Sequence, residues 1–200
     1  MIDSAEALRS VYPAARPRAV AKQLDHLDTH CRRCIALSPF LVLATVGADG
    51  RVDASPRGGE PGFVRVLDEH KLWLPDASGN NRLDSFTNIA QTGRCGLLFF
   101  LPGMDETLRV NGRALLRDDA QVLAQFSPQR HPPRLVLEVV VEEAYLHCAK
   151  ALMRSKLWSD EHHVDRGRFP SMGQMIKEQS GSLEPAETQE QMLVRYREEL

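Results

Sequence analysis

Three short polar motifs, each containing an arginine, follow one another between residues 55 and 112. They are Ser55-Pro56-Arg57-Gly58, the stretch from Leu74 to Arg82, and Thr107-Leu108-Arg109-Val110-Asn111-Gly112. Arginine binds phosphate through paired hydrogen bonds, and Gly, Ser and Asn let backbone N–H groups approach an anion closely. Each motif adjoins a strand-like apolar run. We therefore expect the three motifs to form one site for an anionic ligand with a flat polar ring.

Each motif also has a simpler structural interpretation. Arg57 fits a loop arginine in solvent, and Arg109 fits a surface residue if its face of the strand points outward. Thr107 and Arg109 are two residues apart on a predicted strand, so they point to the same face. Asn80 or Asn81 fits the cap of a following helix. A cap is compatible with a phosphate there, because a helix N-terminus offers free N–H groups and partial positive charge.

The apolar pattern around the motifs predicts a mainly β structure. Strand-like runs bounded by turn residues are expected to form strands at 40–46, 51–54, 63–67, 71–74, 95–101, 107–116 and 135–141. Helical spacing of apolar residues predicts helices at 81–92 and 118–126. Short turns and few helical crossovers favour an antiparallel barrel or a sandwich over a parallel, doubly wound sheet.

Helices are expected on both sides of the β region. The first 37 residues predict two helices, the first beginning with a capping box of Asp3 and Glu6. The second is expected to start near Arg18 and to continue past Cys34. After the strands, the pattern predicts a helix at 147–158, a polar loop at 159–168 and a helix at 185–200.

Composition and charge limit the classes of function. The 200 residues are 42% apolar and 26% charged, as in ordinary globular proteins, and the net charge of -2 argues against a nucleic-acid partner. The N-terminus has no basic segment followed by an apolar one, and no apolar run is long enough to span a bilayer. Four scattered cysteines fit a reducing compartment. We expect a cytoplasmic protein that uses a small molecule and does not associate with a membrane.

Two further clusters are interpreted as structural. Cys31 and Cys34 form a C-x-x-C pair inside a predicted helix, without the preceding strand or the second pair that redox and zinc motifs have. His162 and His163, taken with His147 and Cys148, match no standard zinc spacing and are interpreted as part of a solvated loop. G-x-G-x-x-G, Walker, G-x-S-x-G and H-E-x-x-H motifs are absent. The sequence therefore predicts no metal site, and it identifies no catalytic side chain.

From about Ser38 to Trp158, the sequence resembles the pyridoxamine 5'-phosphate oxidase-like family of FMN-binding split barrels, and in particular a bacterial branch of it. The resemblance lies in the three motifs and in Ser38-Pro39-Phe40, Pro61-Gly62-Phe63, 98–103, 147–151 and 154–158. It implies a mainly β (α+β) fold, a six-stranded antiparallel Greek-key split barrel with flanking helices and a helical C-terminal extension. The chain is thus expected to divide into N-terminal helices that pack on the barrel (1–37), the FMN-binding barrel with its post-barrel helix (38–158) and the extension (159–200).

The resemblance also implies a cofactor and its position. FMN would lie at the interface of a homodimer, with its phosphate at Arg57 and the Asn80-Asn81-Arg82 turn. The other cofactor-binding positions implied are Ser55, Trp73, Leu74, Pro75, Thr107, Arg109, Lys150, Ser155 and Trp158. Lys150, Ser155 and Trp158 would approach from the post-barrel helix. A dimer is also favoured because apolar strands such as Gly96–Leu101 carry more apolar surface than one barrel interior needs.

These features predict an FMN-binding flavoprotein, and specifically an FMN-dependent oxidoreductase that acts on a small molecule. The family's oxidase binds its pyridoxal substrate with an arginine- and histidine-bearing motif near the C-terminus. This chain lacks that motif, so pyridoxamine phosphate oxidation is not expected. Two alternatives stay open, a non-catalytic flavin- or haem-binding module for sensing and a deazaflavin-dependent reductase of the same fold. Catalytic residues do not separate them, because a flavin supplies its own hydride chemistry.

Overall fold

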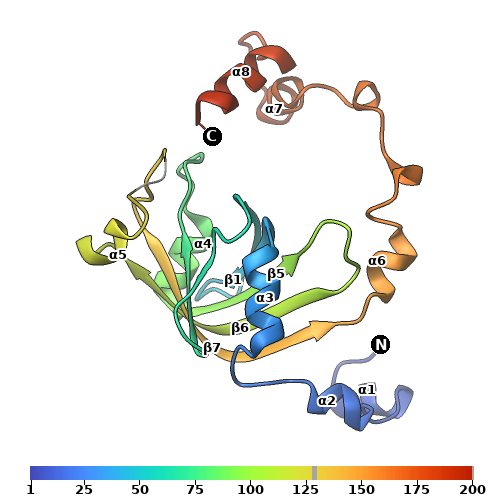
Figure 1. The fold of residues 1–200 in the computed structure, drawn as a ribbon. Coiled ribbons are helices and arrows are strands. Elements are labelled where there is room, and N and C mark those ends of the chain that lie inside the picture. The colour runs from blue at the N-terminus through green and yellow to red at the C-terminus, as the bar shows by residue number, and fades with distance from the viewer. Residues whose placement is uncertain (128–129, 200) are drawn as a thin grey trace.

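The computed structural model describes residues 1–127 and 130–199, and one curved antiparallel sheet forms its centre (Figure 1). In the described residues the sheet has seven strands in the order β2-β1-β5-β6-β7-β4-β3. They are β1 (Phe40–Val46), β2 (Val52–Gly58), β3 (Arg65–Val66), β4 (Lys71–Pro75), β5 (Arg94–Phe100), β6 (Thr107–Arg117) and β7 (Val136–His147). The expected mainly antiparallel α+β fold with flanking helices is confirmed.

The expected number of six strands is wrong. All seven runs predicted from the apolar pattern form strands, and β3 is the additional one. It is short because it pairs with β4 only through Arg65 with Trp73 and Val66 with Leu72. A tight turn then reverses the chain, with Leu67 N–H donating to the carbonyl oxygen of Lys71 over 2.9 Å.

Alternating side chains of the strands build the core. Leu41 and Leu43 of β1 lie opposite Phe99 and Leu97 of β5, and all four side chains are buried. Successive side chains of a strand point to opposite faces, so the residues between these positions face outward. The same alternation determines which side of the sheet each polar motif faces.

Strand β7 extends six residues beyond its predicted end at residue 141. It stays paired with β6 as far as Thr107 opposite His147, with a register shift at Asn111/Gly112. The helix expected at 147–158 is therefore reduced to α6 (Lys150–Ser155). Cross-strand pairing with β6 overrides the local helical pattern at the start of that segment.

Two helices pack closely on the sheet. α3 (Thr29–Leu37) lies against β3, β6 and β7, and α4 (Asp84–Thr92) lies against β1, β2, β5 and β6. The carboxylate of Asp28 caps α3 by accepting from Cys31 N–H at 2.8 Å. Burial raises the pKa of Cys31 to about 12 and that of Cys34 to about 11, which leaves both thiols protonated and agrees with a structural role.

The single helix expected from Arg18 past Cys34 is interrupted. α2 (Pro17–Ala21) ends first, and Leu24 then pairs with Ala144 as an isolated bridge. Leu27 N–H donates to the carbonyl oxygen of Glu69 at 2.7 Å before α3 begins. Hydrogen bonds to β7 and to the β3–β4 turn thus replace helical ones over this stretch.

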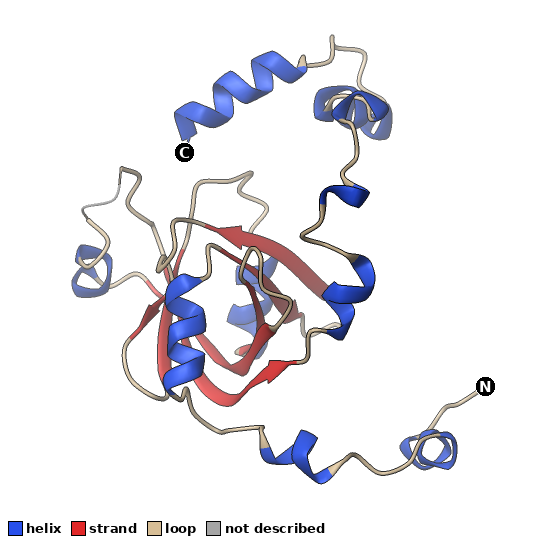
Figure 2. Ribbon diagram, turned by 45° about the vertical axis from the view of Figure 1, so that its right-hand side comes forward, coloured by secondary structure: helices blue, strands red, loops and turns tan. Residues whose placement is uncertain are grey.

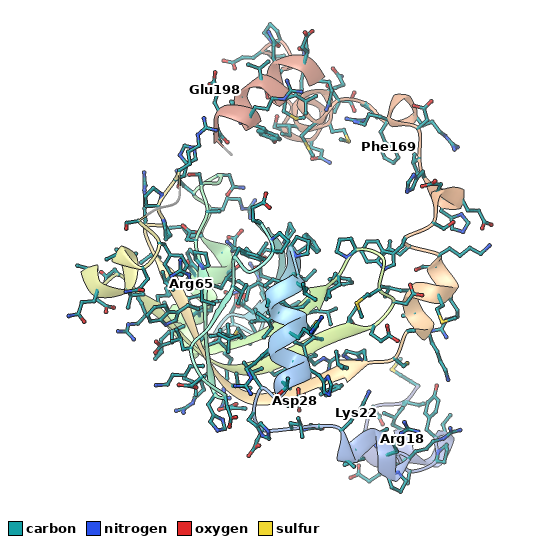
Figure 3. All side chains as sticks on the ribbon, in the orientation of Figure 1. Arg18, Lys22, Asp28, Arg65, Phe169 and Glu198 are labelled. Carbon is teal, nitrogen blue, oxygen red and sulfur yellow. The ribbon has the colours of Figure 1, made fainter. Side chains whose placement is uncertain are left out.

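The chain ends lie outside the sheet. α1 (Ala5–Val11) is capped by Ser4, not by the expected Asp3, and α1 and α2 bury no residue. Figure 2 shows the segment after α6 arching away from the sheet. It leads through two short 3-10 turns to α7 (Met172–Ser180) and α8 (Gln189–Glu199), which pack against each other. Figure 3 shows Phe169 on this arch and Glu198 on α8.

Helix α7 is absent from the sequence-based expectations. Helix α8 begins four residues after the expected start at Pro185, and Leu200, its expected last residue, lies outside the described residues. The remaining helix, α5 (Ala120–Ala124), lies in the predicted segment 118–126. In the part of the chain that the structure describes, no helix is both long and apolar enough to cross a membrane.

Candidate functional site

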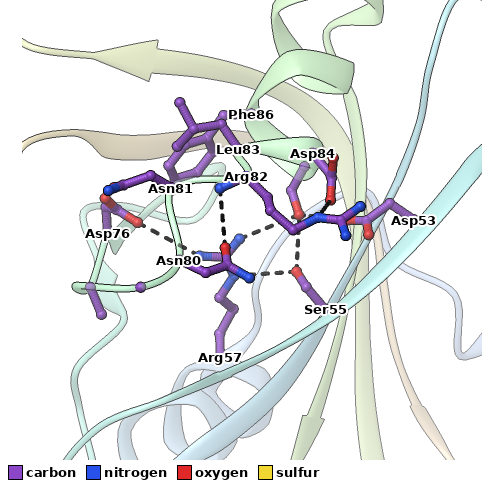
Figure 4. Close-up of a pocket in the computed structure, with 13 residues that line it drawn as sticks. Asp53, Ser55, Arg57, Asp76, Asn80, Asn81, Arg82, Leu83, Asp84 and Phe86 are labelled. Atoms are coloured by element: carbon purple, nitrogen blue, oxygen red, sulfur yellow. Dashed lines mark hydrogen bonds and ion pairs between the residues drawn. The ribbon is translucent and has the colours of Figure 1, made fainter. Parts of the chain in front are cut away.

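The first two arginine motifs meet at one pocket of about 370 Å³ (Figure 4). It lies between β2, at one end of the strand order, and the loop that joins β4 to α4. The residues that line it are Asp53, Ser55, Arg57, Asp76, Ala77, Gly79, Asn80, Asn81, Arg82, Leu83, Asp84, Ser85 and Phe86. The predicted cluster of Ser55, Arg57 and the Asn80-Asn81-Arg82 turn therefore shares one cavity.

The guanidinium of Arg57 is held from several sides. Its Nε donates to Ser55 Oγ and its Nη2 to Ser85 Oγ, both at 3.3 Å, while Nη1 lies 3.7 Å from Asp76 Oδ1. Its Cζ lies 5.3 Å from the centre of the Phe86 ring. The side chain is 23% exposed. Arg57 is thus oriented in advance toward the pocket, and the interpretation as a solvent-exposed loop arginine does not hold.

Strand alternation explains why these groups gather. Asp53, Ser55 and Arg57 are every second residue of β2, so all three face the pocket. Ser85 links them, because its hydroxyl donates to Asp53 Oδ2 at 2.5 Å and lies 3.0 Å from Ser55 Oγ. The alternation of side chains along β2 thus places an arginine, a hydroxyl and a carboxylate on the same face of the strand.

The loop before α4 has an unusual backbone. Asn81 and Leu83 adopt left-handed φ values of 57° and 59°. Asn tolerates this conformation, whereas it is costly for Leu. Leu83 is the N-cap of α4 and provides no side-chain cap. Asn80 accepts from Arg82 N–H at 3.1 Å through its Oδ1 and does not cap the helix either. No side chain therefore caps the first turn of α4 at the pocket, and the free N–H groups of a helix N-terminus favour an anion.

Arg82 differs from Arg57 in its surroundings. Its side chain is 72% exposed at the pocket rim, and its Nε donates to Asp84 Oδ2 at 2.8 Å. A flexible, solvated arginine that already pairs with a carboxylate contributes less to binding than a buried, oriented one.

Carboxylates outnumber guanidinium groups in the pocket. Asp53, Asp76 and Asp84 face Arg57 and Arg82, which makes three negative groups and two positive ones, a formal charge of -1. Burial raises the pKa of Asp76, and the attraction of Arg57 opposes that rise. Sequence reasoning did not select Asp53, Asp76 or Ser85 as site residues. The alternation Asp53-x-Ser55-x-Arg57 is the signal that identifies Asp53.

The third motif does not line this pocket. Thr107 and Arg109 lie on β6, where Thr107 pairs with His147 and Arg109 pairs with Leu98 and Tyr145. The guanidinium carbon of Arg109 lies 5.4 Å from the centre of the Tyr145 ring. Within one chain, the three motifs therefore form two separate regions and not the single site that we expected.

Arg109 borders a broad outer sheet face, which we define by the outward residues of β1, β2 and β5. These residues are Phe40, Val42, Ala44, Val46, Val52, Ala54, Pro56, Leu98 and Phe100. Val42 pairs with both Pro56 and Leu98, and Leu98 pairs with Arg109, so one row of apolar side chains ends at Arg109. Val52 is 83% exposed. A contiguous apolar surface of this kind is typical of an interaction site.

His147 is the last residue of β7, where it pairs with Thr107, and it is close enough to Arg109 to sense its charge. Its ring centre is 4.9 Å from that of Tyr145. Its Nε2 is buried and has no hydrogen-bond partner among the described residues. Burial, together with the charges of Arg109 and Lys22, lowers its pKa, so the ring is neutral at neutral pH.

Trp73, Leu74 and Pro75, which we expected to contact the flavin ring, all lie on β4 but in different environments. Leu74 is buried in the core. Trp73 donates from Nε1 to Glu138 Oε2 at 2.8 Å and packs against Phe126, away from the pocket. Pro75 lines a shallow groove that also includes Arg57. Of the three, Pro75 alone adjoins the Arg57 region.

The expected contributors after the barrel lie away from the Arg57 pocket of their own chain. Lys150 is exposed at the start of α6, and Ser155 Oγ donates to the carbonyl oxygen of Leu152 at 3.0 Å. Trp158 Nε1 donates to the carbonyl oxygen of Met104 at 2.7 Å. Across residues 1–127 and 130–199, no group of three or more His, Cys, Asp or Glu side chains is placed to hold a metal ion.

Comparison with known protein families identifies the family of this chain. Residues 27–148 match the family described as pyridoxamine 5'-phosphate oxidase, which confirms the resemblance found in the sequence. A comparison with curated proteins found no match.

Two solved structures show the same fold. One is a single-residue variant of HupZ from Group A Streptococcus, with a TM-score of 0.51, 16% identity, and coverage of 60% of this chain and 99% of that one. The other is a putative pyridoxamine 5'-phosphate oxidase from Lactobacillus delbrueckii, with a TM-score of 0.50, 22% identity, and coverage of 62% and 98%. At these identities the likeness concerns the fold alone.

Proposed function

The chain belongs to the pyridoxamine 5'-phosphate oxidase family, and we propose that it binds FMN and acts as an FMN-dependent oxidoreductase on a small molecule. The observation that carries the proposal is the Arg57 pocket. There a pre-oriented guanidinium faces the first turn of a helix that has no side-chain cap. Both features favour a phosphate group, and together they do so at one point.

The residues of the pocket have distinct roles in this proposal. Arg57 and the backbone N–H groups at the start of α4 hold the phosphate, while Ser55 and Ser85 keep the guanidinium in place. Arg82 contributes from the rim. When bound, FMN supplies hydride transfer, and the protein supplies position and electrostatics.

We extend the proposal to a homodimer formed through the outer sheet face. Burying its rows of apolar side chains against a second copy removes a large apolar surface from water, which is favourable. In such a dimer Thr107 and Arg109 of one subunit approach the ligand held by the other. Lys150, Ser155 and Trp158 follow β7 in the chain, and in this proposal they too act on the ligand of the second subunit.

The visible spectrum of the purified protein after incubation with FMN and gel filtration tests the proposal. We expect a retained yellow species with a flavin spectrum and micromolar or tighter affinity. Absence of a retained flavin at micromolar protein contradicts FMN binding. Riboflavin, which lacks the phosphate, is the matched control and should bind more weakly.

The same preparation separates an oxidoreductase from a non-catalytic flavin-binding module. NADPH is added without oxygen, and the flavin absorbance is followed. Bleaching that reverses when an electron acceptor is admitted supports turnover. A flavin that neither NADPH nor NADH reduces would favour a sensing or storage role. Competition between FMN and a deazaflavin cofactor identifies which of the two the pocket prefers.

A further inference from the structure

Arg57 already has an anionic partner in the pocket, the carboxylate of Asp76. The two groups are 3.7 Å apart, and their side chains are only 23% and 21% exposed. A guanidinium in this position is not a free anion site. A phosphate that approaches Arg57 must share the guanidinium with Asp76 or replace it.

Several charged groups surround Asp76. From β2 come Arg57 and Asp53, and from the rim of the pocket come Arg82 and Asp84. On the other side, Arg134 lies with Asp76 around a smaller groove just before β7. Two of the three acidic groups have other partners. Asp53 accepts the Ser85 hydroxyl at 2.5 Å, and Asp84 accepts from Arg82 at 2.8 Å.

We propose that Asp76 is the resident counter-anion of Arg57, that a ligand's phosphate takes its place at the guanidinium, and that Asp76 binds one proton from solvent as this happens. With a dianionic phosphate present, three carboxylates and two added charges face only two arginines. Like charges at close range favour protonation of one of them. A protonated carboxyl group gains an O–H that can donate to a phosphate oxygen, so an opposing charge becomes a hydrogen-bond donor.

Asp76 is the carboxylate best placed to take the proton. It alone loses its ion-pair partner when the phosphate binds, and it is the less exposed of the two ion-paired carboxylates, since Asp84 is 50% exposed. Burial already raises the pKa of Asp76, with the attraction of Arg57 and Arg134 acting against the rise. Loss of Arg57 to the phosphate removes the larger of those two attractions.

The consequence is a pocket whose affinity for phosphate depends on pH through Asp76. One proton taken up per ligand lowers the affinity by up to about tenfold for each unit of pH increase. The identity of the ligand as FMN rests on the proposed function, whereas the exchange at Arg57 concerns any phosphate monoester and also inorganic phosphate.

Titration calorimetry of the full-length protein in two buffers of different ionisation enthalpy measures the proton directly. FMN and inorganic phosphate are titrated separately between pH 6 and pH 8. We expect proton uptake with both ligands in the wild type and its loss in Asp76→Asn, which should also bind FMN more tightly at pH 8. Asp84→Asn is the matched control, because it removes the same charge from the same pocket and should retain the uptake. Subtracting variant from wild type cancels the titration of the phosphate itself.

The outcomes are distinguishable. If the wild type binds FMN but takes up no more protons per ligand than Asp76→Asn does, the exchange at Arg57 is wrong. The proposed function then still stands. Binding of inorganic phosphate but not FMN overturns the proposed function, and the proton count then decides the exchange alone. Binding of neither ligand overturns both. If Asp76→Asn does not fold, the wild-type titration with FMN at pH 8 decides. A phosphate monoester is already a dianion at that pH, so zero proton uptake there contradicts the proposal.

Discussion

The two arginine-bearing regions of the barrel, around Arg57 and around Arg109, use opposite faces of the same sheet. Arg57 faces inward at a pocket, where Ser55, Ser85 and Asp76 hold it. Arg109 faces outward, lies over the Tyr145 ring and borders exposed apolar rows. The first region is organised by its own chain. The second has a cation beside an exposed apolar surface, and our proposal is that a second subunit completes it.

The two regions are therefore expected to contribute to ligand binding in different ways. An oriented guanidinium with hydrogen-bonded neighbours loses little freedom when a ligand binds, so its contribution to affinity is large. A cation on an open face is solvated and contributes little until another surface excludes water. We therefore expect changes in the two regions to affect different properties, oligomeric state for the outer sheet face and ligand affinity for the pocket.

The largest effect is expected from Leu98→Asp at the centre of the outer sheet face. A charge buried without a partner in the proposed interface costs about 3–5 kcal/mol, which is enough to dissociate the dimer at micromolar concentration. Light scattering of the purified protein measures the mass. Leu67→Asp is the control, because Leu67 is exposed in the turn between β3 and β4 and is not part of this face. A wild-type protein that is already monomeric would sink the dimer proposal.

A smaller but still large effect is expected from Arg57→Ala. Loss of a charge-assisted hydrogen bond to the phosphate weakens FMN binding by about 1.5–3 kcal/mol, and the dimer should persist. Quenching of flavin fluorescence measures the affinity. Arg51→Ala changes the same charge on an exposed side chain outside the pocket and should leave the affinity near that of the wild type. Equal affinity in the two variants would remove Arg57 from the site.

Mixing variants tests whether Arg109 acts in the second subunit. Arg109→Ala is expected to weaken FMN binding by about 0.5–1.5 kcal/mol, the contribution of one hydrogen bond. If Arg109 serves the partner's pocket, a mixed dimer of Arg57→Ala and Arg109→Ala subunits has one intact site and one doubly altered site. Such a dimer binds one FMN with wild-type affinity. If Arg109 instead serves the pocket of its own chain, each site carries one of the two substitutions. Both sites are then weakened, by the amounts of the two single variants, and no site of wild-type affinity remains.

The smallest effect is expected from Arg82→Ala. Its guanidinium is solvated and paired with Asp84, so its removal costs about 0.2–1 kcal/mol of FMN binding energy. The same fluorescence titration measures it, at low and high salt. A loss as large as that for Arg57→Ala would show that Arg82 turns into the pocket when the phosphate binds.

Local patterns identified most of the β structure and half of the site. All seven apolar runs form strands, and the meeting of Arg57 with the Asn80-Asn81-Arg82 turn was predicted because each adjoins a strand end. The place of Trp73 was not predictable, because its partners Glu138 and Phe126 come from distant parts of the chain. Cross-strand hydrogen bonds also decided where β7 ends and where the helix after Arg18 breaks.

The sequence by itself determined the class of fold, the types of residue that line the Arg57 pocket, and the family to which the chain belongs. Strand period and turn residues are local properties, so they can be read without the fold. The tertiary structure alone decided that Arg57 and Arg109 face opposite sides of the sheet and that Asp76 opposes Arg57. Those relations depend on register between strands far apart in the chain. A shift of one residue in that register reverses every side chain, and no local pattern records it.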